Sequence, residues 1–321
     1  MKALDVVTFG EAMAMFIADE AGPLSEAEHF TRSLAGAETN TAIGIARLGF
    51  KSGWASKVGQ DSFGEFIMKR LEKEGVNTEC VLKDSRYATG FLIKSKAVEG
   101  DPEVQYFRKG SAASTMSPEE ANSGYFLSAR HLHLTGIPLA LSASVKAFSH
   151  QVLTLMKEAG KTVSFDPNVR LALWGSREEM VKEINLAAFQ ADFVLPGAEE
   201  GFILTGSRDP ESIADFYLEQ GVKGVAVKLG PEGAFFKSAE GKGLVSGYKV
   251  ENVMDTVGAG DGFAAGFVSG ILEGLPMAEC VKRGNAIGAM AVQSIGDSDG
   301  YPSREQLVQY MNSHVREADR V

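Results

Sequence analysis

The residues with the clearest chemistry lie in one short stretch, residues 255–267, which reads DTVGAGDGFAAGF. The run before it reads as extended, and the apolar run after it reads as a buried helix. Gly258, Ala259 and Gly260 are therefore expected at a helix N-terminus, where backbone N–H groups lack intrahelical acceptors and the dipole favours negative charge. Glycines also let a bulky anion approach the backbone closely. The stretch predicts an anion hole suited to a phosphate group.

Asp261 follows in the first turn of this expected helix. A carboxylate is poorly suited to binding an anion, but it can accept the proton of a hydroxyl that attacks a phosphate. The stretch is not a Walker loop, since no Gly-Lys-Ser/Thr follows, and its glycine spacing does not match the dinucleotide fingerprint. We interpret Asp261 as a catalytic base. The alternative is a glycine-rich helix cap in which Asp261 only complements the dipole.

The elements that must position these residues are short apolar strands alternating with helices. Because the strands do not alternate apolar with polar residues, both of their faces should be buried. The five clearest runs are VVTFG, HLHLTG, TVSFDP, DFVLP and GVAVKLG. Helix starts with capping residues are indicated at Ser62, Ser117, Ser176, Asp209 and Ser303. The pattern predicts a single α/β domain over residues 1–321, with a mostly parallel sheet covered on both faces.

Two regions break this rhythm, residues 11–34 and 87–109, because neither has a helical face. The second alternates apolar and polar residues and carries a turn at Gly100-Asp101-Pro102, as a hairpin would. Together they predict a small β-sheet standing off the main domain as a lid. The alternative is two long surface loops, although structureless loops of that length are uncommon.

Composition excludes several classes of partner. The 321 residues carry a formal net charge of −10 and are 44% apolar, so a nucleic-acid or anionic-membrane surface is not expected. The N-terminal segment reads as a first strand and not as a signal peptide, and no window reaches membrane-spanning length. Cys80 and Cys280 form no CxxC pair, which favours a reduced, cytoplasmic chain.

Two further stretches indicate ligand contacts. GAETNTAIGIARLG, residues 36–49, sets Asn40 close to Gly36, and an amide both donates and accepts hydrogen bonds, as sugar hydroxyls require. Asn40 could instead be a helix-cap residue. VAVKLGPEGAFF, residues 225–236, reads as a strand, a turn and a second strand, and its glycines permit close approach of a ligand, although a hairpin turn explains them nearly as well.

The stretch over residues 255–267 resembles the C-terminal signature of the ribokinase-type, or phosphofructokinase-B, sugar kinases, and residues 36–49 resemble their N-terminal glycine–asparagine signature. Ala37 stands where the family usually has a second glycine, which narrows the space beside the sugar. The resemblance covers nearly the whole chain. It implies a Rossmann-like three-layer α/β domain with a small β-sheet lid, which phosphorylates a sugar hydroxyl from ATP and Mg²⁺. It also implies that Asp261 is the base and that the amides of residues 258–260 form the anion hole.

The resemblance also implies residues for the nucleotide and for ions. Those expected at the nucleotide are Asn168, Lys228, Gly230, Gly233, Gly258, Gly260 and Asn285. Asn285 lies in a small-residue helix that could simply pack tightly. Glu200 is expected to hold Mg²⁺ through water or else to be a solvated helix-start carboxylate, and Gly197 replaces the asparagine that usually precedes it. Asp255 matches a position at which some members of the family bind a monovalent cation such as K⁺. Alternatively, Asp255 fixes the turn before the anion hole.

The expected substrate is an acidic sugar. Tyr106 and Arg108 should share one face of a lid strand, and Arg170 follows a strand end, where α/β sheets bind ligands. Two arginines that converge on one substrate favour a carboxylate. This combination resembles 2-keto-3-deoxygluconate kinases, in which these residues hold the sugar acid and the terminal hydroxyl becomes the 6-phosphate. By the same resemblance Asp297 reaches the substrate. Arg108 could instead be a surface arginine paired with a carboxylate.

Three rival functions remain open. A fructokinase or a 5-keto-2-deoxygluconate kinase would share the family and its motifs. A non-catalytic sugar or nucleotide sensor would have no need of Asp261. A dinucleotide oxidoreductase would need an acid about 20 residues after the glycines at a second strand end, whereas Glu273 and Glu279 lie in or just after a helix. A homodimer through the lid is also expected from the family resemblance.

Overall fold

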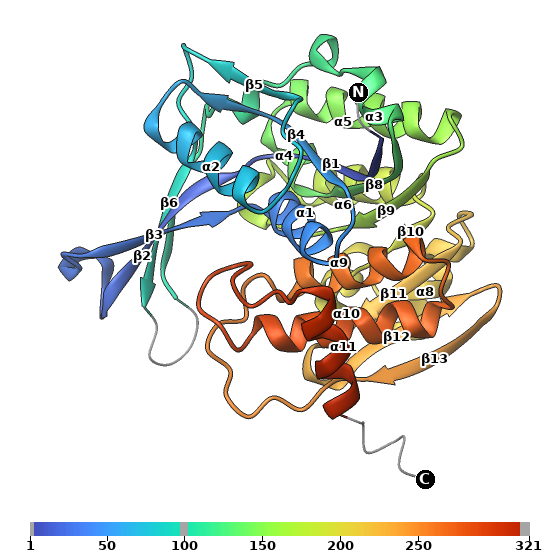
Figure 1. The fold of residues 1–321 in the computed structure, drawn as a ribbon. Coiled ribbons are helices and arrows are strands. Elements are labelled where there is room, and N and C mark those ends of the chain that lie inside the picture. Colours follow the sequence, from blue (N-terminus) through green and yellow to red (C-terminus); the bar gives the residue numbers. More distant parts are fainter. Residues whose placement is uncertain (1–2, 97–101, 315–321) are drawn as a thin grey trace.

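The computed structural model describes residues 3–96 and 102–314. These residues form a nine-stranded sheet and a separate four-stranded sheet. Figure 1 shows the smaller sheet projecting from one side of the main body, with the helices of the last third of the chain below it. The predicted fold class, a large mostly parallel sheet with a small second sheet, is confirmed.

The large sheet has the strand order β13-β12-β11-β10-β9-β8-β1-β4-β5. Every neighbouring pair from β11 to β5 is parallel. At the other edge, the β11–β12 and β12–β13 pairs are antiparallel. The strands are β1 (Leu4–Phe9), β4 (Ser52–Gly59), β5 (Val81–Asp84), β8 (Ala129–Thr135), β9 (Thr162–Asp166), β10 (Phe193–Val194), β11 (Gly224–Lys228), β12 (Gly233–Ser238) and β13 (Gly241–Ser246).

Helices cover both faces of this sheet, which explains the unbroken apolar runs. On β1, Val6 packs with Ile45 and Ala265 on one face, whereas Val7 and Phe9 belong to the large core on the other face. The first face carries α1 (Ala37–Arg47), α9 (Ala259–Leu272) and α10 (Met277–Ala291), with α11 (Arg304–Ser313) packed on α10. The remaining helices are α2 (Ser62–Lys73), α3 (Ser123–Leu127), α4 (Ile137–Leu141), α5 (Ala143–Glu158), α6 (Arg177–Ala188), α7 (Ala198–Thr205) and α8 (Pro210–Leu218).

Most predicted helix starts are confirmed, with two differences. The side chains of Ser176, Asp209 and Ser303 cap their helices as expected. At α2, however, the cap is Asp61, whose carboxylate accepts from the two amides that follow Ser62. An ionised acceptor makes the stronger bond, and the adjacent serine becomes the first helical residue. The box at Ser117 begins only a single 3-10 turn.

The small sheet has the order β3-β2-β6-β7. Its strands are β2 (Met13–Ala21), β3 (Phe30–Ala35), β6 (Phe91–Lys96) and β7 (Val104–Phe107). The antiparallel pairing of β6 with β7 is the expected hairpin, but Gly100 and Asp101 of its predicted turn lie outside the described residues. One face of this sheet buries an apolar cluster that includes Met13, Met15 and Leu92.

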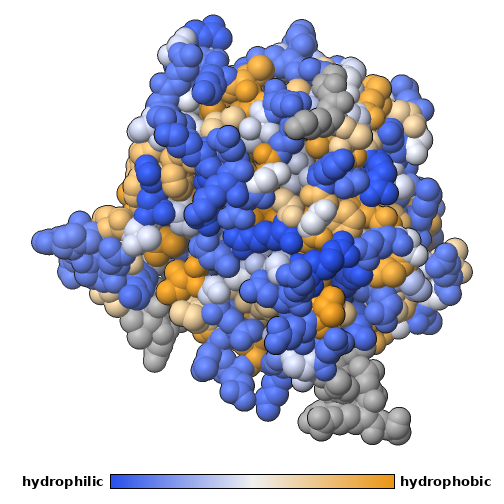
Figure 2. Space-filling model, viewed as in Figure 1, coloured by the Kyte–Doolittle hydropathy of each residue, from blue (hydrophilic) through white to orange (hydrophobic). Residues whose placement is uncertain are grey.

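The surface is mostly polar in the view of Figure 2, where apolar residues appear in small separate groups. Among the described residues, no helix combines the length and the apolar character that a membrane span requires. Cys80 and Cys280 are both free thiols.

Candidate active site

The N-terminus of α9 is held in place by close backbone packing. Gly258 precedes the helix with a φ of +81°, in the left-handed region. A Cβ at this position would lie 1.8 Å from the carbonyl oxygen of Asp297, so only glycine fits. The hydroxyl of Tyr301 donates to the Gly258 carbonyl at 2.5 Å. The backbone conformation that opens the helix is therefore fixed from two sides.

The first amides of α9 are available to a ligand. The N–H groups of Gly258, Gly260 and Asp261 donate to no acceptor in the described part of the chain, whereas that of Ala259 makes a long bond, 3.4 Å, to the Thr256 carbonyl. Free amides at a helix N-terminus attract anions. The geometry forms the expected hole from Gly258 and Gly260, with Asp261 adding an amide and Ala259 contributing less than its neighbours.

The Asp261 carboxylate is held by two side-chain amides. Asn40, from α1, donates to Oδ2 at 2.8 Å, and Asn168, from the segment after β9, donates to Oδ1 at 3.2 Å. Asn168 has a φ of +42°, a conformation that non-glycine residues adopt at some strain. Asn168, expected at the nucleotide, and Asn40, expected at the sugar, both therefore orient the predicted base.

The electrostatic setting of Asp261 suits a base. Burial raises the pKa of Asp261 to about 6, against the opposing effect of the hydrogen bond from Asn40. The carboxyl group is thus largely ionised at neutral pH while being more basic than an exposed aspartate, which is what general-base catalysis near neutral pH requires.

Two cavities meet at this point. The smaller has a volume of about 310 Å³ and the larger of about 710 Å³, and both are lined by Lys228, Thr256 and Gly260. Asp261 lines only the smaller one. The junction of the two cavities therefore lies at the free amides of α9, with the predicted base on one side of it.

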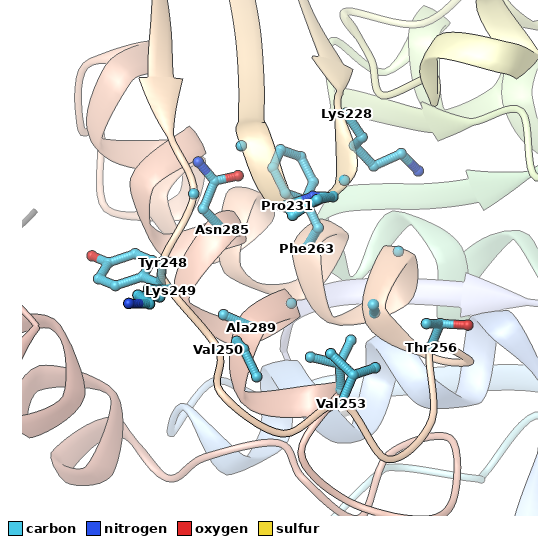
Figure 3. A pocket seen from close by; sticks show the side chains of 18 residues that line it. Lys228, Pro231, Tyr248, Lys249, Val250, Val253, Thr256, Phe263, Asn285 and Ala289 are labelled. Atoms are coloured by element: carbon cyan, nitrogen blue, oxygen red, sulfur yellow. The ribbon is translucent and has the colours of Figure 1, made fainter. Parts of the chain in front are cut away.

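The larger cavity has the character of a nucleotide site. Gly230, Gly233 and Asn285, which the sequence predicts at the nucleotide, line it, whereas Asn168 and Gly258 do not. Figure 3 shows Asn285 and Ala289 reaching it from α10, Phe263 from α9 and Val253 from the segment that follows β13. The Asn285 amide donates to the Val245 carbonyl at 2.9 Å, so part of its role is to hold the cavity wall. Apolar walls with glycine openings suit a flat ring that carries a phosphate tail.

Lys228 supplies positive charge at the junction. Its ammonium lies 2.6 Å from Asp166 Oδ2, at the carboxyl ends of β11 and β9, which flank β10 in the sheet. Burial alone would lower the pKa of Lys228, but the carboxylates of Asp166 and Glu200 raise it above its ordinary value. The group therefore stays charged. Asp166 was missed by the sequence interpretation, although its place at a strand end, just before Pro167-Asn168, could have indicated it.

The smaller cavity gathers all the residues predicted for the sugar. Gly36, Ala37, Asn40, Tyr106, Arg108, Arg170 and Asp297 line it. Asp297 is 6% exposed, and its Oδ1 accepts no hydrogen bond from any described residue. Burial raises the pKa of Asp297 to about 7. A hydroxyl-bearing ligand would satisfy this oxygen.

Arg108 already has a partner within the protein. Its Nε and Nη2 contact Glu11 Oε2 at 2.6 and 2.5 Å, and Ser111 donates to the other oxygen of that buried carboxylate. Arg170 is exposed and donates only to the carbonyl of Val169. The positive charge of Arg108 is thus offset by Glu11, and Arg170 is the less compensated of the two. Glu11 was also missed, although an acid directly after the first strand occupies a ligand-binding edge.

The two residues predicted at ions are engaged with the protein. Glu200 accepts from the Gly197 and Val169 amides, each at 2.8 Å, so it closes the start of α7 and ties it to the segment after β9. Glu200 lines the smaller cavity. Asp255 lies 2.5 Å from the ammonium of Lys94 and lines neither cavity.

The comparison with protein families decides the class. Residues 3–304 match the model of the pfkB family of carbohydrate kinases. The chain belongs to this family. The ribokinase-type family predicted from its two signatures is therefore confirmed.

Relatives of this pfkB-family kinase span its full length. It is 54% identical to a 2-dehydro-3-deoxygluconokinase of Bacillus subtilis (strain 168), over 97% of this chain and 96% of that protein. A PfkB protein from Polaromonas sp. JS666 has a solved structure with a TM-score of 0.89 and 49% identity, covering 95% of this chain and 99% of that one. A structure of an E. coli protein in complex with ATP and Mg²⁺ has a TM-score of 0.89 and 27% identity, covering 97% and 100%.

The acidic residues of the site fit a Mg²⁺ ion that arrives with a nucleotide. Among the described residues, no group of three or more His, Cys, Asp or Glu side chains could hold a metal unaided. The oxygens of Asp166 and Glu200 have protein partners, yet each carboxylate oxygen retains a lone pair. Mg²⁺ usually keeps several waters and binds through one or two carboxylates plus phosphates, which suits these two groups.

Gly258→Ala tests the backbone of the anion hole. The new methyl group would clash with the Asp297 carbonyl and would disfavour the left-handed φ, so the amides should move and kcat should fall by roughly a hundredfold. Gly274→Ala is the matched control, because Gly274 also has a positive φ, of +70°, but has open space around it. It should change stability by about 1 kcal/mol and leave kcat near wild type. Equal kcat losses in the two variants would contradict the role of Gly258.

The pH profile tests the base. Asp261 must be ionised to accept a proton, and its raised pKa means that the ionised fraction falls as the pH drops through about 6. We expect kcat/KM to be level above this value and to fall by about tenfold per pH unit well below it. Circular dichroism at each pH checks that the chain stays folded. The Asp297→Asn variant checks that the second titrating carboxyl group of the cavity does not cause the fall of kcat/KM at low pH. A profile that stays level down to pH 5 would refute the assignment.

Proposed function

We propose that this protein transfers the γ-phosphoryl group of ATP to the terminal hydroxyl of 2-keto-3-deoxygluconate (2-dehydro-3-deoxy-D-gluconate), giving the 6-phosphate. The observation that carries the proposal is the position of Asp261: its carboxylate lines the smaller cavity, while Gly260, whose amide is free, lines both cavities. A hydroxyl beside Asp261 and a phosphoryl group at that amide would be held together, as group transfer requires.

The acidic sugar is favoured by charge and by kinship. Arg108 and Arg170 line the smaller cavity, and Arg170 has no carboxylate partner among the described residues. A guanidinium binds a carboxylate through two parallel hydrogen bonds, which a neutral sugar cannot offer. The B. subtilis relative at 54% identity is named for this substrate. Within the family, fructose is the neutral alternative, and 5-keto-2-deoxygluconate is a second sugar acid.

In the proposed mechanism, the sugar hydroxyl oxygen attacks the γ-phosphorus while the bond from that phosphorus to the bridging oxygen of ADP breaks. The hydroxyl proton passes to Asp261, which Asn40 and Asn168 hold in place. The amides of Gly258 and Gly260 stabilise the negative charge on the transferring group, and Lys228 adds a cation at the same junction. No covalent bond to the protein is needed.

The nucleotide and its metal have defined places in this proposal. ATP occupies the larger cavity, with its base between the walls near Asn285 and its phosphates toward Lys228, Gly230 and Gly233. Glu200 and Asp166 would hold Mg²⁺ through its waters. When bound, Mg²⁺ neutralises charge on the nucleotide phosphates.

The small sheet would act as a lid over the sugar and as a dimer contact. Phe16, Phe63, Phe91 and Phe107 form an aromatic cluster at this sheet, and Phe107 remains 47% exposed. A partly exposed aromatic cluster on a projecting sheet suits contact with a second copy. A cytoplasmic location, consistent with two free cysteines, completes the proposal.

Asp261→Asn tests the reaction. The amide keeps the shape of the carboxylate but cannot take the proton, so kcat should fall by roughly a thousandfold or more, while calorimetry should detect nearly unchanged sugar binding. Asp209→Asn is the control, since it replaces an exposed helix-cap aspartate by a residue that caps equally well. Wild-type turnover in Asp261→Asn would refute the base. No ATP consumption by the wild-type protein on any sugar would favour the sensor.

Arginine variants test the sugar acid. Arg170→Met should raise KM for 2-keto-3-deoxygluconate by about tenfold, because a charged hydrogen bond is lost, and should change KM for fructose far less. Arg108→Met is made together with Glu11→Gln, so that no buried carboxylate loses its cation. Arg86→Met, at an exposed position outside both cavities, is the control. Equal increases of KM for the sugar acid and for fructose would contradict the proposal that these arginines bind the substrate carboxylate.

A further inference from the structure

The carboxylate of Asp255, which the family resemblance assigned to a monovalent cation, is occupied by a side chain of the protein itself. Lys94 Nζ lies 2.5 Å from Asp255 Oδ2, and the two side chains are 6% and 9% exposed. The other oxygen of Asp255 accepts from the Val257 amide at 3.1 Å. A buried ammonium in contact with this carboxylate would repel a free K⁺ ion, so the residues present do not fit that ion here.

This ion pair joins two separate parts of the fold. Lys94 lies on β6 of the small sheet, 161 residues away in sequence from Asp255. Asp255 lies three residues before Gly258, on the segment that leads into α9, and the backbone there is fixed by bonds from Met254 and Asp255 to the Val292 carbonyl. In Figure 1 the end of β6 faces the orange segment that precedes α9. The small sheet thus contacts the segment that leads into the anion hole through one buried ammonium.

The positive charge of Lys94 offsets the negative charge of the carboxylates near the start of α9. Asp297 interacts electrostatically with both Asp255 and Asp261, so three carboxylates lie near the amides that are proposed to accept a phosphoryl group. Lys94 also interacts with Asp297, whose Oδ1 has no hydrogen-bond donor among the described residues. Without a fixed cation, these carboxylates would oppose an anion at the α9 amides. An ammonium and K⁺ carry the same charge, but the ammonium is permanently attached.

We propose that Lys94 is a tethered cation that replaces a monovalent metal ion beside the anion hole and positions the segment from Asp255 to Gly258. The inference rests on the proposed kinase function and deepens it. Lys94 touches neither cavity, so it is a positioning residue and acts through Asp255. Its consequence is that the kinase works without added K⁺, and that the small sheet sets the charge at the phosphate site.

The experiment removes the Lys94 ammonium and then supplies K⁺ or NH₄⁺ from solution. Lys94→Met removes the charge and keeps the length of the side chain, and Lys96→Met is the matched control, on the same strand with an exposed ammonium that donates only to the Asp19 carbonyl. Initial rates are measured in KCl, NH₄Cl and choline chloride at equal ionic strength, so that screening is the same. Wild type and Lys96→Met should give the same kcat in all three salts. Lys94→Met should lose kcat by roughly tenfold or more in choline and recover part of it in KCl or NH₄Cl.

A ligand-free measurement separates this role from general stability. The unfolding midpoint of Lys94→Met should rise in KCl relative to choline, whereas that of wild type should not. Lys94→Met with Asp255→Asn removes both charges, and it should regain stability without regaining kcat. A merely structural pair would regain both. Lys94→Arg keeps the charge and tests the proposal if Lys94→Met does not fold, because it should remain independent of K⁺.

Two results would overturn the inference: activation of the wild-type enzyme by K⁺ over choline, or full kcat of Lys94→Met in choline. Failure of the proposed substrate is distinguishable, because wild type would then fail to turn over 2-keto-3-deoxygluconate in every salt. The midpoint measurements need no substrate and would still decide the cation question.

Discussion

The proposed site depends on one electrostatic conflict: Asp261 would have to stay ionised beside the amides at which we propose that a phosphoryl group, itself an anion, binds. As the third residue of α9, it shares the helix N-terminus with the free amides. Burial raises the pKa of Asp261 to about 6, while the amide of Asn40 favours the ionised form. Lys228 adds positive charge at the cavity junction. The outcome is a carboxylate that is charged at neutral pH and still basic enough to take a proton.

The parallel sheet brings these groups together. Glu11 follows β1, Asp166 ends β9 and Lys228 ends β11, and the carboxyl ends of parallel strands lie along one edge. The anion hole comes from a different place, the helix after the antiparallel β12–β13 hairpin, and Gly258 reaches the edge only because its backbone packs directly on Asp297. The hydrogen bond from Asn40 to Asp261 thus joins residues 221 positions apart.

The features that could be predicted from the sequence are those in which the local backbone conformation restricts the residue type. The helix start at Gly258 and Asp261 was predictable because a left-handed residue before a helix and an acid in its first turn restrict which residue types fit. The partners of the side chains were not predictable in the same way: the carboxylate that holds Arg108 lies 97 residues away, and Asn168 turned toward the base and not toward the larger cavity. Such pairs depend on strand order. The burial of Lys94 was only weakly indicated: it lies two residues after the buried Leu92 and therefore shares its face of the strand.

The small sheet connects recognition with chemistry. Tyr106 lies opposite Leu92 in the register of β6 and β7, and Lys94 follows on the same face of β6. The strand pair that presents Tyr106 and leads into Arg108 therefore also carries the cation that meets Asp255. The small sheet therefore contacts both the smaller cavity and the segment that leads into α9. A kinase must avoid transferring phosphate to water, and under the proposed function this shared element would link the sugar site to the phosphate site.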